Sequence, residues 1–411
     1  TLPDVPKVKG YTNLGWTTEK GETELEYSAG DTVKITKATQ FYAVRRKSNY
    51  YTVSYYLGNG STNAAYQKLT QTVEEGTVVI FAKVPARTGY VNQGWSSKKN
   101  SEKATAKAKC TVNKNITLYA VQKKAVQLTF HRCDGSTWQK TTLAKGSSYS
   151  LPGVRDAEGY TFMGWSTKPM QSVSPQYEAE EKITVNGNVD LYAVVFNRTT
   201  ETDLTEDQLP QVDIYKYKQV IFVGDSRTEF MENVLTGMGE SATKNVKFVC
   251  SAGKGLDWFT TTGWAQLYSI VQHDSNSILS KKTAVIFNFG VNDLSKSADY
   301  AEYYNWIAPQ LKSKGCELYF MSVNPVNRLM LPNAGRADRS EAAVRSFNQY
   351  MKANLSSAYT YIDMYSYLKS TGYSFASDHY GTGTVDDGLH YTTRTYKRIF
   401  AKCMDSLRVP A

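Results

Sequence analysis

Residues 219–227 read QVIFVGDSR and join an apolar run to a polar one. The uninterrupted run of β-branched and aromatic side chains before Gly224 is typical of a strand that is buried on both faces of a parallel sheet. Gly224 then breaks the strand, and the polar residues after it suit the first turn of a helix. A serine in this place has its hydroxyl at the sheet edge and its amide at a helix N-terminus, where partial positive charge favours an anion. The stretch therefore predicts a strand, a turn and a helix that together present Ser226.

Short apolar runs continue to alternate with longer segments of helical period from residue 215 to the end of the chain. This alternation is typical of a parallel sheet flanked by helices. We predict strands at 219–223, 246–250, 284–289, 317–323 and 360–364, and helices near 227–237, 256–272, 299–314, 339–354 and 391–407. Because open sheets of this kind bind ligands at the carboxyl ends of their strands, we expect the chemistry just after each strand.

Three more polar segments stand where such a site would draw its residues. SAGKG at 251–255 follows the second strand, GVND at 290–293 follows the third, and DGLH at 387–390 precedes the last helix. Each segment alone, like Gly-Asp-Ser itself, is more typical of a turn or a helix cap. Their occurrence together, in order and at these places, is improbable by chance and indicates a functional site at this edge of the sheet.

The four segments resemble the sequence blocks of the SGNH (GDSL-like) hydrolase family. The resemblance covers residues 215–411 and implies a three-layer α/β/α domain with a five-stranded parallel, flavodoxin-like sheet. It implies that Ser226 is the nucleophile, His390 the general base and Asp387 the acid that orients the base. The oxyanion hole would consist of the backbone amides of Ser226 and Gly255 and the side chain of Asn292. A spacing of three between acid and base suits a tight turn, in which the carboxylate folds back on the imidazole.

Some positions in this assignment have alternatives nearby. Gly253 could take the place of Gly255, and Asp386 directly precedes Asp387. His379 is a competing base, but its neighbouring Asp is adjacent rather than three residues away, so we interpret it as a residue of a substrate loop. We expect a polar pocket rim formed by four side chains: Arg227, Trp258, Asn324 and His379. For Arg227 and Asn324, a surface position and a turn are equally compatible with the sequence.

The first half of the chain contains a pattern that occurs three times. A Gly-Tyr pair is followed by a Gly-Trp pair, which ends at Trp16, Trp95 or Trp165, and later by Tyr-Ala-Val. Alternating runs such as 52–56 and 127–130, bounded by Gly, Asn and Asp, predict strands. We expect the Trp of each unit to anchor its small core. The pattern resembles the Listeria-Bacteroides (internalin B-type) repeat, a small β-grasp-like module of bacterial surface proteins.

These patterns predict a multidomain chain. We expect a first, partial β-repeat at 1–48, a second at 49–124, a third at 125–198, a linker at 199–214 and the hydrolase domain at 215–411. The stretch 197–214 is acidic and rich in Thr, with few apolar side chains, which is typical of a linker. Because the chain starts at Thr1 without an initiator Met or an apolar leader, we expect a processed or truncated piece.

The net charge of +10 belongs to the first half of the chain. Residues 1–200 have 26 Lys and Arg against 16 Asp and Glu, whereas residues 201–411 have 22 of each kind. The basic repeats could contact a cell wall or another anionic polymer, although a dispersed solvated face explains the charge as well. We expect no nucleic-acid partner, no transmembrane segment and a monomer. The five cysteines are too scattered for a disulfide framework or a zinc site.

Taken together, the sequence predicts an extracellular serine esterase, secreted or held at the surface of a Gram-positive-type bacterium. Its expected substrate is an acylated carbohydrate polymer, from which it would remove O-acetyl or other short acyl groups, or another small ester. We expect no cofactor, because a P-loop, a dinucleotide fingerprint and the HExxH motif are absent from the sequence. The alternatives are a cell-wall glycan O-acetyltransferase, a short-chain lipase or acylhydrolase, and a surface adhesin whose hydrolase domain is inactive.

Overall fold

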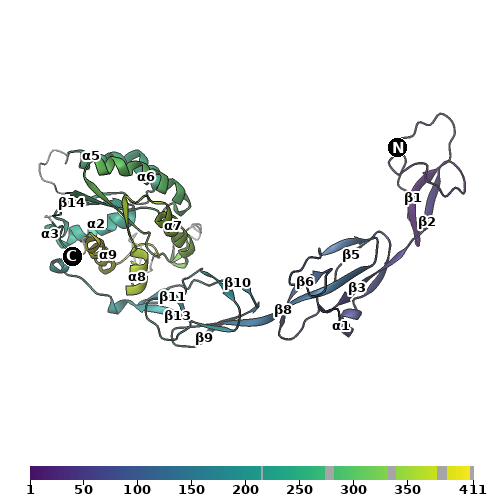
Figure 1. Ribbon diagram of the computed structural model, residues 1–411, viewed down its shortest axis with the longest axis horizontal. Coiled ribbons are helices and arrows are strands. Elements are labelled where there is room, and N and C mark those ends of the chain that lie inside the picture. Colours follow the sequence, from purple (N-terminus) through teal and green to yellow (C-terminus); the bar gives the residue numbers. More distant parts are fainter. Residues whose placement is uncertain (214–215, 274–281, 332–338, 377–386, 408–411) are drawn as a thin grey trace. The chain divides into compact units, whose positions relative to one another are not determined.

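The computed structural model describes residues 1–213, 216–273, 282–331, 339–376 and 387–407 (Figure 1). The chain forms two compact units. One consists of Thr1–Gln127 with Thr142–Ser147, and the other of Leu128–Thr141 with Ser148–Ala411. The second unit therefore contains most of the third repeat together with the α/β domain.

Each Gly-Tyr to Gly-Trp segment forms a strand that pairs antiparallel with the later Tyr-Ala-Val strand. The pairs are β1 (Tyr11–Thr17) with β2 (Tyr42–Lys47), β6 (Tyr90–Ser96) with β8 (Ile116–His131), and β11 (Tyr160–Ser166) with β13 (Val189–Asn197). A β-bulge precedes the Gly of Gly-Trp in all three pairs. The predicted repeats are therefore confirmed as three copies of one local structure.

The Trp of each pair is held in the same way. Its indole nitrogen donates a hydrogen bond to the carbonyl oxygen 13 residues earlier, over 2.7 Å for Trp16, 2.6 Å for Trp95 and 2.8 Å for Trp165. Trp95 and Trp165 are buried core residues, as predicted, whereas Trp16 is only half-buried. The second repeat also contains β3 (Tyr50–Tyr56), α1 (Ala64–Gln67), β4 (Gln71–Glu74), β5 (Thr77–Ile80) and β7 (Lys109–Val112), and the third contains β9 (Thr137–Ala144), β10 (Ser147–Ser150) and β12 (Lys182–Val185).

The α/β domain has a parallel sheet with the strand order β15-β14-β16-β17-β18. Its strands are β14 (Tyr217–Gly224), β15 (Val246–Cys250), β16 (Lys282–Asn288), β17 (Cys316–Met321) and β18 (Tyr359–Ile362). All five predicted strands are confirmed to within a few residues. The first strand in the chain lies next to the second and the third, which is the flavodoxin-like order that the resemblance implies.

Helices cover both faces of this sheet (Figure 1). Alternate residues of β14 point to opposite faces: Ile221 and Val223 pack under one helix layer, and Val220 and Phe222 under the other. The first layer consists of α4 (Leu256–Trp258), the π-helical turn Phe259–Gly263, α5 (Trp264–His273), α6 (Ser297–Ser313) and α7 (Glu341–Asn354). The second consists of α2 (Ser226–Met238), α3 (Glu240–Thr243), α8 (Met364–Thr371) and α9 (Thr393–Ser406). The predicted three-layer architecture is confirmed, with α3 and α8 in addition to the predicted helices.

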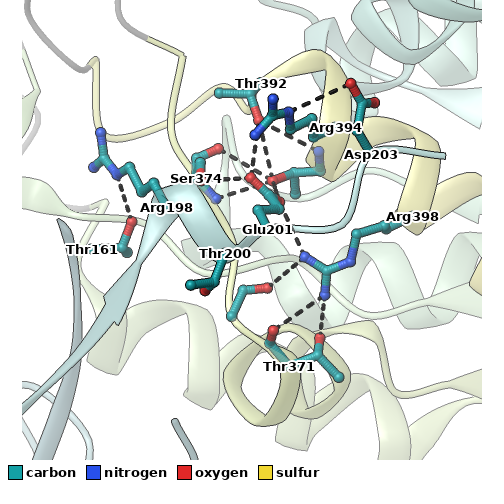
Figure 2. Close-up of polar contacts among 12 residues, drawn as sticks. Thr161, Arg198, Thr200, Glu201, Asp203, Thr371, Ser374, Thr392, Arg394 and Arg398 are labelled. Atoms are coloured by element: carbon teal, nitrogen blue, oxygen red, sulfur yellow. Dashed lines mark hydrogen bonds and ion pairs between the residues drawn. The ribbon is translucent and has the colours of Figure 1, made fainter. Parts of the chain in front are cut away.

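The segment between the third repeat and β14 packs on the α/β domain and is not a free linker. Leu209 and Val212 are 3% and 6% exposed and belong to the core beneath α2 and α9. Glu201 is 5% exposed, and Figure 2 shows its carboxylate among side chains of the segment before α9 and of α9 itself. It accepts hydrogen bonds from Ser374 Oγ at 2.5 Å, from Thr395 Oγ1 and from the Arg398 guanidinium at 3.0 Å. The polar composition of this segment therefore conceals a buried ion pair.

This ion pair predicts that Glu201→Ala lowers the stability of the α/β domain. Removing one partner leaves the Arg398 charge buried without its carboxylate, which costs about 3 kcal/mol or more. The matched control is Asp207→Ala, because Asp207 is an exposed carboxylate of the same segment and accepts a hydrogen bond from the exposed Thr205 hydroxyl. We expect that control to change stability by less than about 1 kcal/mol. Denaturant unfolding followed by Trp fluorescence measures the stability of both variants. Equal losses of stability in the two variants would show that the buried Glu201–Arg398 ion pair does not stabilise the domain.

Candidate active site

Ser226 is the first residue of α2, directly after β14 and the N-cap residue Asp225. The Asp225 carboxylate accepts a hydrogen bond from the Arg227 amide at 3.0 Å, which caps the helix and fixes its first turn. Ser226 is 6% exposed. The strand end and the cap thus place the hydroxyl at the carboxyl edge of the sheet, as the sequence predicts.

A chain of two hydrogen bonds connects Ser226 to a carboxylate through an imidazole. Ser226 Oγ lies 2.9 Å from His390 Nε2, and His390 Nδ1 lies 2.5 Å from Asp387 Oδ2. The second oxygen, Asp387 Oδ1, accepts from the amides of Leu389 at 2.8 Å and His390 at 2.7 Å. The structure therefore brings together the three side chains that the sequence predicts as nucleophile, base and acid.

The surroundings of Asp387 fix the tautomer of the imidazole. Burial alone would raise the pKa of Asp387, but the hydrogen bonds and charge of His390 and the two backbone amides hold this pKa below its ordinary value. Because the carboxylate is ionised, it accepts the proton on Nδ1 and leaves the Nε2 lone pair for the Ser226 hydroxyl. The Phe230 and His390 rings pack edge to face, with their centroids 5.0 Å apart.

Arg227 lies inside the domain and not at the pocket rim, so this part of the prediction is wrong. Its side chain is 2% exposed and donates to three backbone carbonyls: Leu389 at 3.0 Å, Asn324 at 2.9 Å and Pro325 at 2.9 Å. These carbonyls attract the guanidinium inward, because a buried cation needs acceptors on all sides. Asn324, also predicted at the rim, is 1% exposed and equally buried. Arg227 instead ties the start of α2 to the segment that carries His390.

The loops after β15 and β16 lie against each other, which places Gly255 and Asn292 on neighbouring segments. Asn292 Nδ2 donates to the Lys254 carbonyl at 2.7 Å. Asp293 accepts from the Leu256 amide at 2.9 Å and from Tyr300 Oη at 2.7 Å. A Cβ atom at Gly255 would lie 2.4 Å from the Asp293 carboxylate, so these two residues are in close contact.

Two further residues act on these loops without having been singled out in the sequence. Asp293 follows Asn292 in the GVND segment. A carboxylate after a strand does not by itself indicate that it accepts a hydrogen bond from the Leu256 amide. Arg339 is 4% exposed and donates from its guanidinium to Asn292 Oδ1. No local pattern marks Arg339, because its partner lies 47 residues earlier in the chain.

The remaining rim predictions differ in outcome. Trp258 is half-buried at the border of the core, and the centroid of its ring lies 6.1 Å from the centroid of the Phe289 ring. His379 lies outside the described residues, so its predicted place in a substrate loop stays a prediction.

The buried N-cap gives the domain a pH dependence that can be tested. Burial and the nearby Asp293 raise the pKa of Asp225 to about 7, and Arg227 opposes this rise. In the unfolded chain this carboxyl ionises near pH 4, so between about pH 4 and pH 7 unfolding releases a proton and stability falls as the pH rises. Asp225→Asn keeps the capping oxygen and cannot ionise. We expect the variant to gain stability relative to the parent across this range, by up to about 4 kcal/mol, as measured by thermal unfolding. A constant difference between the two proteins at every pH would contradict the raised pKa.

Comparison with known families agrees with this architecture. Residues 220–403 match the GDSL-like lipase/acylhydrolase family. The C-terminal domain is a member of this family. Residues 1–44, 51–121 and 127–194 match the Listeria-Bacteroides repeat domain, so the three predicted repeats are confirmed as members of that family.

Relatives and solved structures cover parts of the chain. A protein of Evansella cellulosilytica with the provisional name Gly-rich membrane protein is 27% identical over 186 residues, which are 45% of this chain and 20% of that protein. A second protein of this organism, provisionally named a membrane protein, is 24% identical over 192 residues, or 46% of this chain and 27% of that protein. This chain thus spans about a quarter or less of the length of either relative. No helix among the described residues is long and apolar enough to cross a membrane.

Among solved structures, the GDSL-like domain is similar to an acetyl xylan esterase, with 10% identity and a TM-score of 0.32, covering 46% of this chain and 100% of that one. The C-terminal catalytic domain of peptidoglycan O-acetyltransferase A from Streptococcus pneumoniae is 16% identical with a TM-score of 0.30, covering 46% of this chain and 92% of that one.

Proposed function

We propose that the GDSL-like domain is a serine esterase that removes O-acetyl or other short acyl groups from a carbohydrate polymer. The observation that supports this proposal best is the hydrogen-bonded series from Ser226 through His390 to Asp387. In this mechanism Ser226 attacks the ester carbonyl as His390 takes its proton. His390 then protonates the leaving alcohol, and water activated by the same imidazole releases the acid from the acyl-enzyme.

The oxyanion of this reaction would lie near the start of α2, between the neighbouring loops. We infer three donors: the Ser226 amide at the helix N-terminus, the Gly255 amide and the Asn292 side chain. Arg339 supports the role of Asn292, because a guanidinium can only donate and therefore binds the oxygen of the Asn292 amide. The nitrogen must then face away from Arg339. It carries two N–H groups, of which the Lys254 carbonyl takes one.

Two features support a small acyl group on a large polar partner. Ser226 and His390 are 6% and 2% exposed, so only a small part of each side chain is open to a substrate. The attached repeats match the Listeria-Bacteroides repeat family. We infer that they act as spacer or adhesion modules of a secreted or surface-held enzyme. In such a setting, acylated cell-wall glycans and other polysaccharides would be within reach of the enzyme.

The nucleophile is tested by Ser226→Ala and His390→Ala with p-nitrophenyl acetate. We expect each single variant to lose about a thousandfold or more of kcat, because Ser226→Ala removes the nucleophilic oxygen and His390→Ala removes the base that activates it. The double variant should be no worse than the singles, since the two side chains act as one unit. Equal, near-zero rates for the parent protein and Ser226→Ala would instead favour an adhesin with an inactive hydrolase domain.

The main competing activity is acetyl transfer to a glycan, which would use the same three side chains and differ in the acceptor. The esterase proposal predicts that acetate release from p-nitrophenyl acetate equals p-nitrophenol release, whether or not a glycan oligosaccharide is present. Acetate yield is measured enzymatically, and the oligosaccharide is examined by mass spectrometry. An oligosaccharide that gains acetyl groups while free acetate falls by the same amount would establish the transferase instead.

A further inference from the structure

Asn327 lies between the turn that carries Asp387 and His390 and the third repeat. On one side its backbone amide donates to the carbonyl of Gly388, inside the turn, at 2.8 Å. On the other side its side-chain nitrogen donates to Asp156 Oδ1 at 2.9 Å and to the Val154 carbonyl at 3.1 Å. One residue therefore contacts both the acid–base turn and the repeat.

The contact with the turn is close. Gly388 has a φ of +67°, and a Cβ atom there would lie 2.3 Å from the Asn327 carbonyl oxygen and 2.8 Å from Met330 Cβ. The segment 327–330 therefore packs directly on the backbone between Asp387 and Leu389. A shift of this segment would move the turn with it, since no intervening side chain absorbs the displacement.

The contact with the repeat is equally well fixed. The Asp156 side chain is fully buried, pairs with Arg198 at 2.8 Å and accepts from the Phe162 amide at 2.9 Å. The acceptor that holds Asn327 is thus itself held by the β11 strand and by the segment after β13. It is a rigid part of the repeat.

Neighbouring residues extend this contact in both directions along the loop. The repeat's Glu180 pairs with Arg328 at 3.0 Å, and Arg155 donates to the Leu329 carbonyl. On the preceding side, the repeat's Glu178 pairs with Lys369, which also pairs with Glu341 at 3.0 Å, and Glu341 accepts from the Val326 amide at 3.1 Å. Apolar contact continues the interface, because Met163, Val194 and Phe196 of the repeat belong to the core beneath α8 and α9.

We propose that the third repeat is part of the catalytic unit and that Asn327 is a positioning residue that holds the Asp387–His390 turn against Ser226. The inference rests on the proposed esterase function. It assigns the third repeat a role that a spacer would not have, because Asp156 and the Val154 carbonyl accept the hydrogen bonds that fix the Asn327 side chain, and the Asn327 backbone amide binds the turn that carries the base. Asn327 touches neither the substrate nor the reacting atoms and acts through the turn.

The test is Asn327→Asp in the full chain. The variant keeps the shape of the side chain and the oxygen that accepts from the Leu329 amide at 3.2 Å, but it places a carboxylate against Asp156 and the Val154 carbonyl. The matched control is Arg328→Ala, which removes the neighbouring ion pair of the same loop, between the exposed Arg328 and the half-buried Glu180. Steady-state kinetics with p-nitrophenyl acetate, well below the melting temperature of each protein, give kcat and KM. Hydrogen exchange with mass spectrometry gives the protection of the Leu389 and His390 amides.

We expect Asn327→Asp to lose about tenfold to a hundredfold of kcat with KM within about twofold, because the base is displaced while the pocket remains. The Leu389 and His390 amides should exchange faster in this variant, and Arg328→Ala should change neither quantity. An Asn327→Asp protein with a lower melting temperature but parental kcat and parental exchange would show that the repeat only stabilises the fold, and would overturn the proposal. If the parent protein is inert toward esters, the proposed function fails, and the exchange result alone then decides whether Asn327 positions the turn.

Discussion

The 2.9 Å contact between Ser226 and His390 depends on holding together two segments that are 164 residues apart in the sequence. Ser226 is fixed by β14 and by the N-cap of α2, which are local features of the chain. Within its own turn His390 binds only Asp387, and the Ala376 amide donates to the His390 carbonyl at 2.8 Å, so other segments set the place of the turn. Arg227 provides one such constraint through the Leu389 carbonyl, and Asn327 provides another through the Gly388 carbonyl. The place of His390 therefore depends on hydrogen bonds that other segments make to the backbone of its turn.

Buried cations recur as the means by which this domain joins distant segments. Arg227 binds three carbonyls, Arg398 binds Glu201 together with the end of α8, and Lys369 lies between Glu178 and Glu341. In each case a long side chain from a helix or its first turn reaches acceptors on a loop or on the third repeat. A buried charge is costly unless all of its donors are used, so each cation specifies one arrangement of the segments around it. The same property makes the loss of a single partner destabilising.

The sequence predicted those parts of the molecule that depend on local pattern. The apolar run at 220–223, the Gly after it and the four polar segments were enough to predict a parallel sheet with its site at the strand ends, and to reveal the family resemblance that implied the sheet order and the grouping of Ser226, Asp387 and His390. What it could not predict depends on contacts between distant residues. Arg227 was placed at the rim as a polar group suited to a polar substrate, but its three carbonyl partners come from loops at 324–325 and 389, which no local pattern indicates. Glu201 was assigned to a linker because its partners are some 170 to 200 residues away.

The central claim is that Ser226 is a nucleophile activated by His390, and covalent labelling tests it most directly. The parent protein is treated with a sulfonyl fluoride, which reacts with an activated serine, and the modified peptide is identified by mass spectrometry. The account predicts a single adduct on Ser226 in the parent protein and no adduct in His390→Ala. An unmodified Ser226 beside a labelled serine elsewhere, or equal labelling of Ser226 with and without His390, would contradict it.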